Sequence, residues 1–307
     1  MGKNLIPVLS MIFSLCMLGC KNNVDMRNAI HGTIIISTQN EISALDIGSL
    51  AKSQPKWNKI VASKDEYRYP DLSPNGKQIV TGYLSWEEGQ PTRRGPDTFY
   101  HLATLNADGT GERILLKDTE NYEYPSWSPD GKLIACITYP NSSGDRKGKI
   151  CILELTSKKL KCFEKYEVNV AKPAWSFDGH LLAFTTTKSE IALYDKNSDE
   201  VKLLPAIGKS PVFHPDGQHI FYIQTDNQAL CSISIDGSDK KIVKNGFIDY
   251  LVKFSKDGQY LFYVGGGYHF MILPGPEYST LELLNLKDLT SIRVDKLSAL
   301  YGISWLE

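Results

Sequence analysis

A short motif that ends in an Asp-Gly or Asn-Gly turn recurs five times in this chain of 307 residues. The clearest copy is YPSWSPDGKLIACI at 124–137. The copies align on Gly76, Gly131, Gly179, Gly217 and Gly258, at spacings of 55, 48, 38 and 41 residues. Such turns favour β-hairpins because glycine accepts a positive φ without steric cost. Five strand-rich units at this spacing predict the blades of a β-propeller.

Each unit is expected to contain four antiparallel strands. In the second unit the turn at 129–131 is followed by the apolar segments 132–139, 149–155 and 160–166, which a loop and a short turn separate. Several strands are apolar at consecutive positions, so both faces of each sheet must be covered. Radially stacked blades provide that cover. The residue four places before each glycine is then expected to pack between blades; these residues are Leu72, Trp127, Trp175, Phe213 and Phe254.

The two ends of the chain complete one further unit. The segment at 32–63 has three strand patterns but no opening strand, whereas 299–307 has only an opening strand, with Trp305 at the aromatic position. The sequence therefore predicts an all-β fold, a six-bladed β-propeller of four-stranded blades. Pairing of the N-terminal and C-terminal strands would close the ring and remove exposed sheet edges.

The motif P-x-W-S-P-D-G-K-x-I-A at 125–135, together with N-A-D-G-T at 106–110, resembles the TolB-type β-propeller repeat. The resemblance covers residues 31–307, with Phe177, His214 and Lys256 departing from the motif in later copies. We expect no counterpart of the α/β domain that precedes the propeller in TolB itself. The resemblance implies a non-catalytic periplasmic protein that binds or scaffolds a partner, although a shared fold does not name that partner.

The N-terminus resembles a bacterial lipoprotein signal. Lys3 precedes an apolar segment at 5–18 that is too short to span a bilayer, and Gly19-Cys20 follows it. The resemblance implies a signal peptide at 1–19, acylation of Cys20, a linker at 20–30 and the propeller at 31–307. Lys21 suggests the outer membrane, with the protein facing the periplasm. The alternative is an ordinary cleaved signal peptide with an incidental cysteine.

The charge balance excludes one class of partner. Lysine and arginine total 34 against 35 acidic residues, which leaves no strong field to attract nucleic acid. The run Gly265-Gly266-Gly267 is not followed by a helix pattern, so it does not indicate a phosphate loop. We expect no cofactor, and a protein or glycan of the cell envelope as partner.

The candidate binding site lies at the mouth of the central channel, where the opening strands start together. The residues expected there are Tyr67, Arg68, Tyr69, Tyr122, Glu123, Tyr124, Asp249, Tyr250 and Tyr301. Tyrosine presents a rigid apolar ring with a polar tip, which suits a peptide or a sugar ring. The alternative is that these residues only pack the funnel. Long loops at 85–100, 140–148 and 265–280 would crowd the same face, either as binding loops or as tolerated insertions.

An alternative function is a metal-assisted polysaccharide lyase or hydrolase. His214 and His219 flank one turn, and His180 lies at the equivalent turn of the preceding unit, so three histidines could share one rim. Against this, no carboxylate and histidine spacing typical of a metal enzyme accompanies them, and there is no G-x-S-x-G motif for a serine hydrolase. We therefore expect no catalytic residues and no metal.

Cys151 and Cys162 are expected to face each other across a hairpin whose turn is Thr156-Ser157. An exported protein can form disulfides, but cysteines on opposite strands also stay reduced as small core residues. The sequence leaves both states open.

Overall fold

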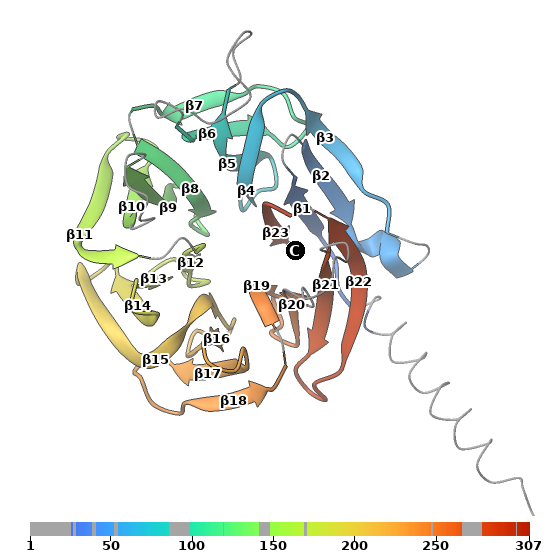
Figure 1. The fold of residues 1–307 in the computed structure, drawn as a ribbon, viewed down its shortest axis with the longest axis vertical. Coiled ribbons are helices and arrows are strands. Elements are labelled where there is room, and N and C mark those ends of the chain that lie inside the picture. The colour runs from blue at the N-terminus through green and yellow to red at the C-terminus, as the bar shows by residue number, and fades with distance from the viewer. Residues whose placement is uncertain are drawn as a thin grey trace, which may run out of the picture.

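The computed structural model describes Met26 and residues 29–38, 41–51, 55–85, 99–118, 120–140, 148–168, 171–246, 248–265, 278–298 and 300–307. The strands form antiparallel sheets arranged as a ring around a central axis (Figure 1). The chain is therefore an all-β propeller. No helix within the described ranges is long and apolar enough to cross a membrane.

Four sheets have four strands each. The first contains β1 (Thr33–Ser37), β2 (Glu41–Asp46), β3 (Asn58–Ala62) and β23 (Gly302–Leu306). The second contains β4 (Glu66–Leu72), β5 (Gln78–Leu84), β6 (His101–Asn106) and β7 (Arg113–Leu116). The third contains β8 (Glu120–Trp127), β9 (Leu133–Pro140), β10 (Gly148–Glu154) and β11 (Leu160–Val168). The fourth contains β19 (Ile248–Phe254), β20 (Tyr260–Gly265), β21 (Tyr278–Asn285) and β22 (Ser291–Ser298).

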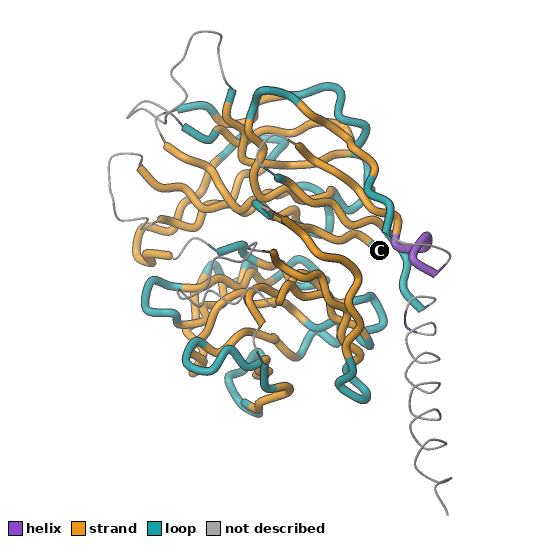
Figure 2. The backbone as a smooth tube through the Cα atoms, turned by 45° about the vertical axis from the view of Figure 1, so that its right-hand side comes forward, coloured by secondary structure: helices purple, strands orange, loops and turns teal. Residues whose placement is uncertain are grey.

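The remaining strands form one seven-stranded sheet. They are β12 (Ala174–Trp175), β13 (Leu181–Thr185), β14 (Glu190–Asp195), β15 (Glu200–Phe213), β16 (His219–Gln224), β17 (Leu230–Ser234) and β18 (Lys241–Lys244). A 3-10 helix, η1 (Ile47–Ala51), lies on the outside of the ring (Figure 2).

This seven-stranded sheet corrects the prediction of six separate four-stranded sheets, because hydrogen bonding among the described strands gives five. The cause is β15, which continues without a break from one unit into the next. Its first part pairs with β14 up to Ile207, and its second part pairs with β16 from Gly208 onward. A Cβ atom on Gly208 would lie 2.5 Å from the carbonyl oxygen of Ile223, so this crossing point requires glycine.

The predicted ring closure is confirmed. β1 pairs antiparallel with β23, from Thr33 opposite Leu306 to Ser37 opposite Gly302. The two ends of the fold therefore share one sheet, and Trp305 is 1% exposed in its core. Met26 and Ile30, which the sequence assigned to a linker, are buried against this core.

The repeated S-P-D-G motif is a self-stabilised hairpin turn. In the clearest copy, Gly131 has a φ of 69°, as the turn requires. The Asp130 side chain accepts a hydrogen bond from the backbone N–H of Lys132, and the Ser128 hydroxyl accepts one from the N–H of Leu133. Each opening strand therefore ends at a fixed turn, which lies at the opposite end of the channel from the strand's first residue.

The aromatic position of the motif packs as predicted. Trp127 clusters with Val80 and Leu102 from the neighbouring sheet, and Phe254 packs edge-on against Phe221. The burial of these side chains between sheets is the main force that holds the ring together. The hairpin register is also as predicted, because Cys151 lies opposite Cys162 and the two form a disulfide.

Candidate functional site

The innermost strands line a channel that has two different ends. Figure 1 shows β4, β8, β12, β19 and β23 nearest the axis. All of them start on the same face, where the tyrosines were predicted to gather, and run toward the face that carries the S-P-D-G turns. We call the first end the tyrosine mouth and the second the turn face.

Two of the predicted tyrosines do not lie at the tyrosine mouth. Tyr67 is 3% exposed and Tyr122 is 2% exposed, and both belong to cores between sheets. Their hydroxyls donate to Glu112 and Asp118. Burial raises the pKa of Tyr67 to about 12. Their part in the binding site is corrected, because both side chains pack between sheets, ahead of the bulges that interrupt β4 after Arg68 and β8 after Glu123.

The tyrosines two positions later along each strand do point into the channel. Tyr69 and Tyr124 stack with ring centroids 3.7 Å apart and an angle of 21° between the rings. Both have a positive φ, 53° and 54°, and each precedes a proline at a bulge in its strand. Such a conformation is unfavourable for a bulky residue and is often found at functional sites.

Arg68 is held between aromatic rings at the same end. Its guanidinium lies 4.5 Å from the ring centroid of Tyr100 and 4.9 Å from that of Tyr301. It forms ion pairs of 3.3 Å with Glu66 and 3.7 Å with Glu123. Burial alone would lower the pKa of Arg68, but Tyr100 and the two acids raise it overall, so Arg68 stays charged.

The two remaining predicted mouth residues, Tyr250 and Asp249, lie on β19. Tyr250 is half-buried beside the channel, and burial, with Asp71 and Tyr69 nearby, raises its pKa. Asp249 is half-exposed at the start of β19. The structure thus brings Tyr69, Tyr124 and Tyr250 together and sets Arg68 beside Glu123 and Tyr301, but Arg68 and Glu123 are buried, at 5% and 1% exposed.

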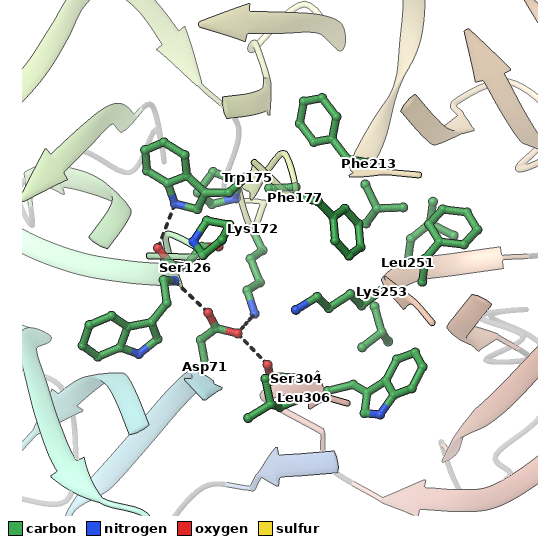
Figure 3. Close-up of a pocket in the computed structure, with 18 of the residues that line it drawn as sticks. Asp71, Ser126, Lys172, Trp175, Phe177, Phe213, Leu251, Lys253, Ser304 and Leu306 are labelled. Atoms are coloured by element: carbon green, nitrogen blue, oxygen red, sulfur yellow. Dashed lines mark hydrogen bonds and ion pairs between the residues drawn. The ribbon is translucent and has the colours of Figure 1, made fainter. Parts of the chain in front are cut away.

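A cavity of about 340 Å³ opens toward the turn face (Figure 3). In every repeat unit, the residue immediately before the aromatic position is among those that line it. These residues are Asp71, Ser126, Ala174, Val212, Lys253 and Ser304. Lys172 reaches the cavity from the segment before β12.

Asp71 is the polar centre of this cavity. Its carboxylate accepts hydrogen bonds from Lys172 Nζ at 2.6 Å, from Ser304 Oγ at 2.5 Å and from the backbone N–H of Trp127 at 2.8 Å. These donors come from three other repeat units, so one carboxylate links strands across the channel (Figure 3). Lys253 points toward this group from the opposite wall.

No site was predicted at this cavity, whose lining includes the residue before the aromatic position of each unit. A signal was present. In an otherwise regular motif, that position carries a carboxylate in Asp71, an ammonium in Lys253, and small residues elsewhere. The variation marks the residues that face the axis.

The three histidines do not form a common metal site. His214 and His219 both contact the carboxylate of Asp216, with Nδ1 to Oδ2 distances of 2.9 and 2.7 Å. His180 is exposed at a different turn, beside Asp178. Among the residues that the structure describes, no cluster of three or more potential metal ligands occurs.

Several predicted features lie outside the described residues. These are Cys20 with its signal peptide and most of the three long loops, at 86–98, 141–147 and 266–277.

The family model described as the TolB beta propeller domain matches residues 86–272, more than half of the chain. The chain belongs to this family. A Tol-Pal system protein TolB from Pelagibacter ubique is 40% identical over 74 residues, which cover 22% of this chain and 16% of that protein. The TolB of Francisella tularensis subsp. mediasiatica is 28% identical over 123 residues, which cover 40% of this chain and 27% of that protein. The chain therefore matches less than a third of the length of either relative.

Solved structures show the same fold. TolB from Acinetobacter baumannii superposes with a TM-score of 0.65 at 18% identity, over 89% of this chain and 66% of that chain. A putative TolB from Agrobacterium tumefaciens gives 0.65 at 17% identity, over 87% and 92%. A chain from a nidogen/laminin complex gives 0.63 at 10% identity, over 90% and 99%. At these identities the likeness concerns the fold alone.

Proposed function

We propose that this TolB-like propeller is a non-catalytic lipoprotein that binds or scaffolds a protein or glycan of the bacterial envelope through its tyrosine mouth. We count the seven-stranded sheet as two blades that share β15, which gives six blades in all. The anchor in this proposal is an acyl group on Cys20, and the protein faces the periplasm from the outer membrane.

The stacked pair Tyr69 and Tyr124 is the observation that carries the proposal. Both rings are held in the channel by a backbone conformation that tyrosine rarely adopts. A third unit has Ser210 at the equivalent position, with a φ of 52° and a following proline. The bulge therefore does not need an aromatic side chain, and the two tyrosines supply contact surface rather than the turn.

A buried, ion-paired arginine supports the aromatic rings beside the stacked pair. Arg68 lies between two aromatic rings and two carboxylates, which fix its guanidinium. Arg68 is only 5% exposed, so it supports Tyr301 rather than offering contact surface itself. Rigid tyrosine side chains are typical of residues that contribute most to binding at interfaces, because little conformational entropy is lost when they are covered. The names of the relatives place them in the Tol-Pal system, which supports an envelope partner.

Serine replacements test this function. The double variant Tyr69→Ser with Tyr124→Ser copies the residue that the fold already accepts at position 210. In crosslinked envelopes of the producing bacterium, we expect affinity capture of the partner to fall at least about tenfold, the equivalent of about 1.4 kcal/mol. The control is Tyr166→Ser, which changes a half-buried tyrosine on the outer strand β11. An unchanged set of partners in the double variant, with an intact thermal melt, would refute the proposal.

The anchor has its own test. Radiolabelled palmitate should enter the wild-type chain and not Cys20→Ser. Incorporation that persists in Cys20→Ser would remove the lipoprotein part of the proposal.

A further inference from the structure

We infer that the cavity at the turn face is a binding site for a small carboxylate ligand that carries an apolar group, with the ammonium of Lys253 as the counter-ion. This site opens at the opposite end of the channel from the tyrosine mouth, and Tyr250 lines its inner end. It does not depend on the proposed function.

The size of the cavity suits a small ligand. Its volume of about 340 Å³ is near the lower end of the range for ligand pockets, roughly 300–1,000 Å³. The fixed S-P-D-G turns form its entrance, so the cavity exists before any ligand binds. A small molecule or the end of a peptide fits such a site, and a folded domain does not.

The charges in the cavity favour an anion. Three lysines line it, Lys172, Lys253 and Lys256, against two carboxylates, Asp71 and Glu307. Asp71 already accepts hydrogen bonds from Lys172, Ser304 and a backbone N–H. Glu307 accepts a hydrogen bond from the backbone N–H of Lys256. The carboxylate of Asp71 is therefore occupied by groups other than Lys253.

The charge of Lys253 is not paired within the described residues. In the part of the chain that the structure describes, no hydrogen bond or ion pair joins its ammonium to another residue, and the side chain points into the cavity (Figure 3). The side chain is exposed to the water of the cavity. Desolvation by the surrounding walls lowers its pKa, and Lys172 and Lys256 lower it further, while Asp71 and Glu307 act in the opposite direction. An anion beside Lys253 would supply the missing charge.

The walls favour an organic anion over an inorganic one. The apolar residues around the charged centre include Pro74, Pro129, Phe177 and Leu306, together with the edges of Trp127 and Trp175. Sulfate or phosphate would leave these walls in contact with water. A carboxylate with an attached ring or hydrocarbon chain buries them, and removal of apolar surface from water favours binding.

Titration of the purified full chain with phenylacetate and with its neutral analogue phenylacetamide tests the charge. We expect phenylacetate to bind, and phenylacetamide and inorganic sulfate to bind at least about tenfold more weakly. Lys253→Met keeps a side chain of similar length without charge, and should weaken phenylacetate at least about tenfold. The control Lys132→Met removes an exposed lysine from a turn on the same face and should change nothing.

A second arm identifies the source of the carboxylate. N-acetyl-glycyl-phenylalanine presents the carboxylate of a peptide end, and its C-terminal amide is the matched control. Tighter binding of this peptide than of phenylacetate assigns the site to chain ends; binding of phenylacetate alone assigns it to a free organic acid. Equal binding of acid and amide, no loss in Lys253→Met, or no binding of any carboxylate at millimolar concentration would each overturn the inference.

Discussion

Lys172 and Asp71 form an ion pair of 2.6 Å inside the channel although 101 residues separate them in the sequence. The pair joins the second sheet to the segment that precedes β12, on the far side of the third sheet. Propeller blades otherwise contact only their neighbours. This ion pair therefore ties two units whose sheets are not neighbours, whereas the hydrogen bond from Ser304 joins adjacent sheets.

Removal of the Asp71 carboxylate is expected to destabilise the fold. Asp71→Ala would leave Lys172 without its partner and two donors unsatisfied, at a cost of roughly 2–4 kcal/mol. Urea unfolding would show a lower midpoint for Asp71→Ala, and a smaller loss for Asp71→Asn, which keeps an oxygen acceptor. A stability equal to wild type in Asp71→Ala would mean that the link across the channel contributes nothing.

The contribution of Lys253 to the free energy of unfolding depends on pH. Burial lowers the pKa of Lys253 in the folded chain, and Lys172 and Lys256 lower it further, against opposing effects of Asp71 and Glu307. Between this lowered pKa and the unfolded value of about 10.4, the unfolded chain binds more protons, so this group makes stability rise with pH. Lys253→Met lacks this effect.

We therefore expect Lys253→Met to be more stable than wild type below the lowered pKa, and the difference to shrink as the pH rises toward about 10.4. Unfolding midpoints measured across this range check the prediction, with Lys132→Met as the control. A difference that is constant with pH would show that Lys253 is charged at no cost in the folded protein.

The disulfide between Cys151 and Cys162 closes a short hairpin loop. Restriction of the unfolded chain by a loop of this size is worth about 3 kcal/mol, so replacement of both residues by alanine should lower stability by roughly 2–3 kcal/mol. Mass spectrometry of protein isolated from the envelope should find this bond, with Cys136 and Cys231 as free thiols. Four free thiols would contradict the structure.

Local rules account for what the sequence predicted well. The hairpin turns follow from glycine with positive φ, the Cys151 and Cys162 register from counting outward from Thr156-Ser157, and the ring closure from Trp305 at the aromatic position. Each of these depends on residues close together in the sequence or on one repeated pattern.

The remaining features depend on the arrangement of units around the axis. β15 is continuous because Gly208 lets one strand cross between sheets. No turn motif in the sequence predicts this crossing. Tyr67 and Tyr69 look equivalent in the sequence, but the bulge at Tyr69 sends one side chain into the channel and leaves the other in the core. The cavity around Asp71 and Lys253 becomes visible only when equivalent positions meet in space.

Site-specific photocrosslinking in living cells tests the tyrosine mouth most directly. Benzoylphenylalanine in place of Tyr301, beside Arg68, keeps an aromatic ring at the mouth. The same probe in place of Ile242 lies on the outermost strand β18, where the side chain is 54% exposed. We predict a covalent adduct with an envelope partner from position 301 and none from position 242. Adducts from position 242 alone, or from neither position, would contradict the proposal that this propeller binds its partner at the mouth of the channel.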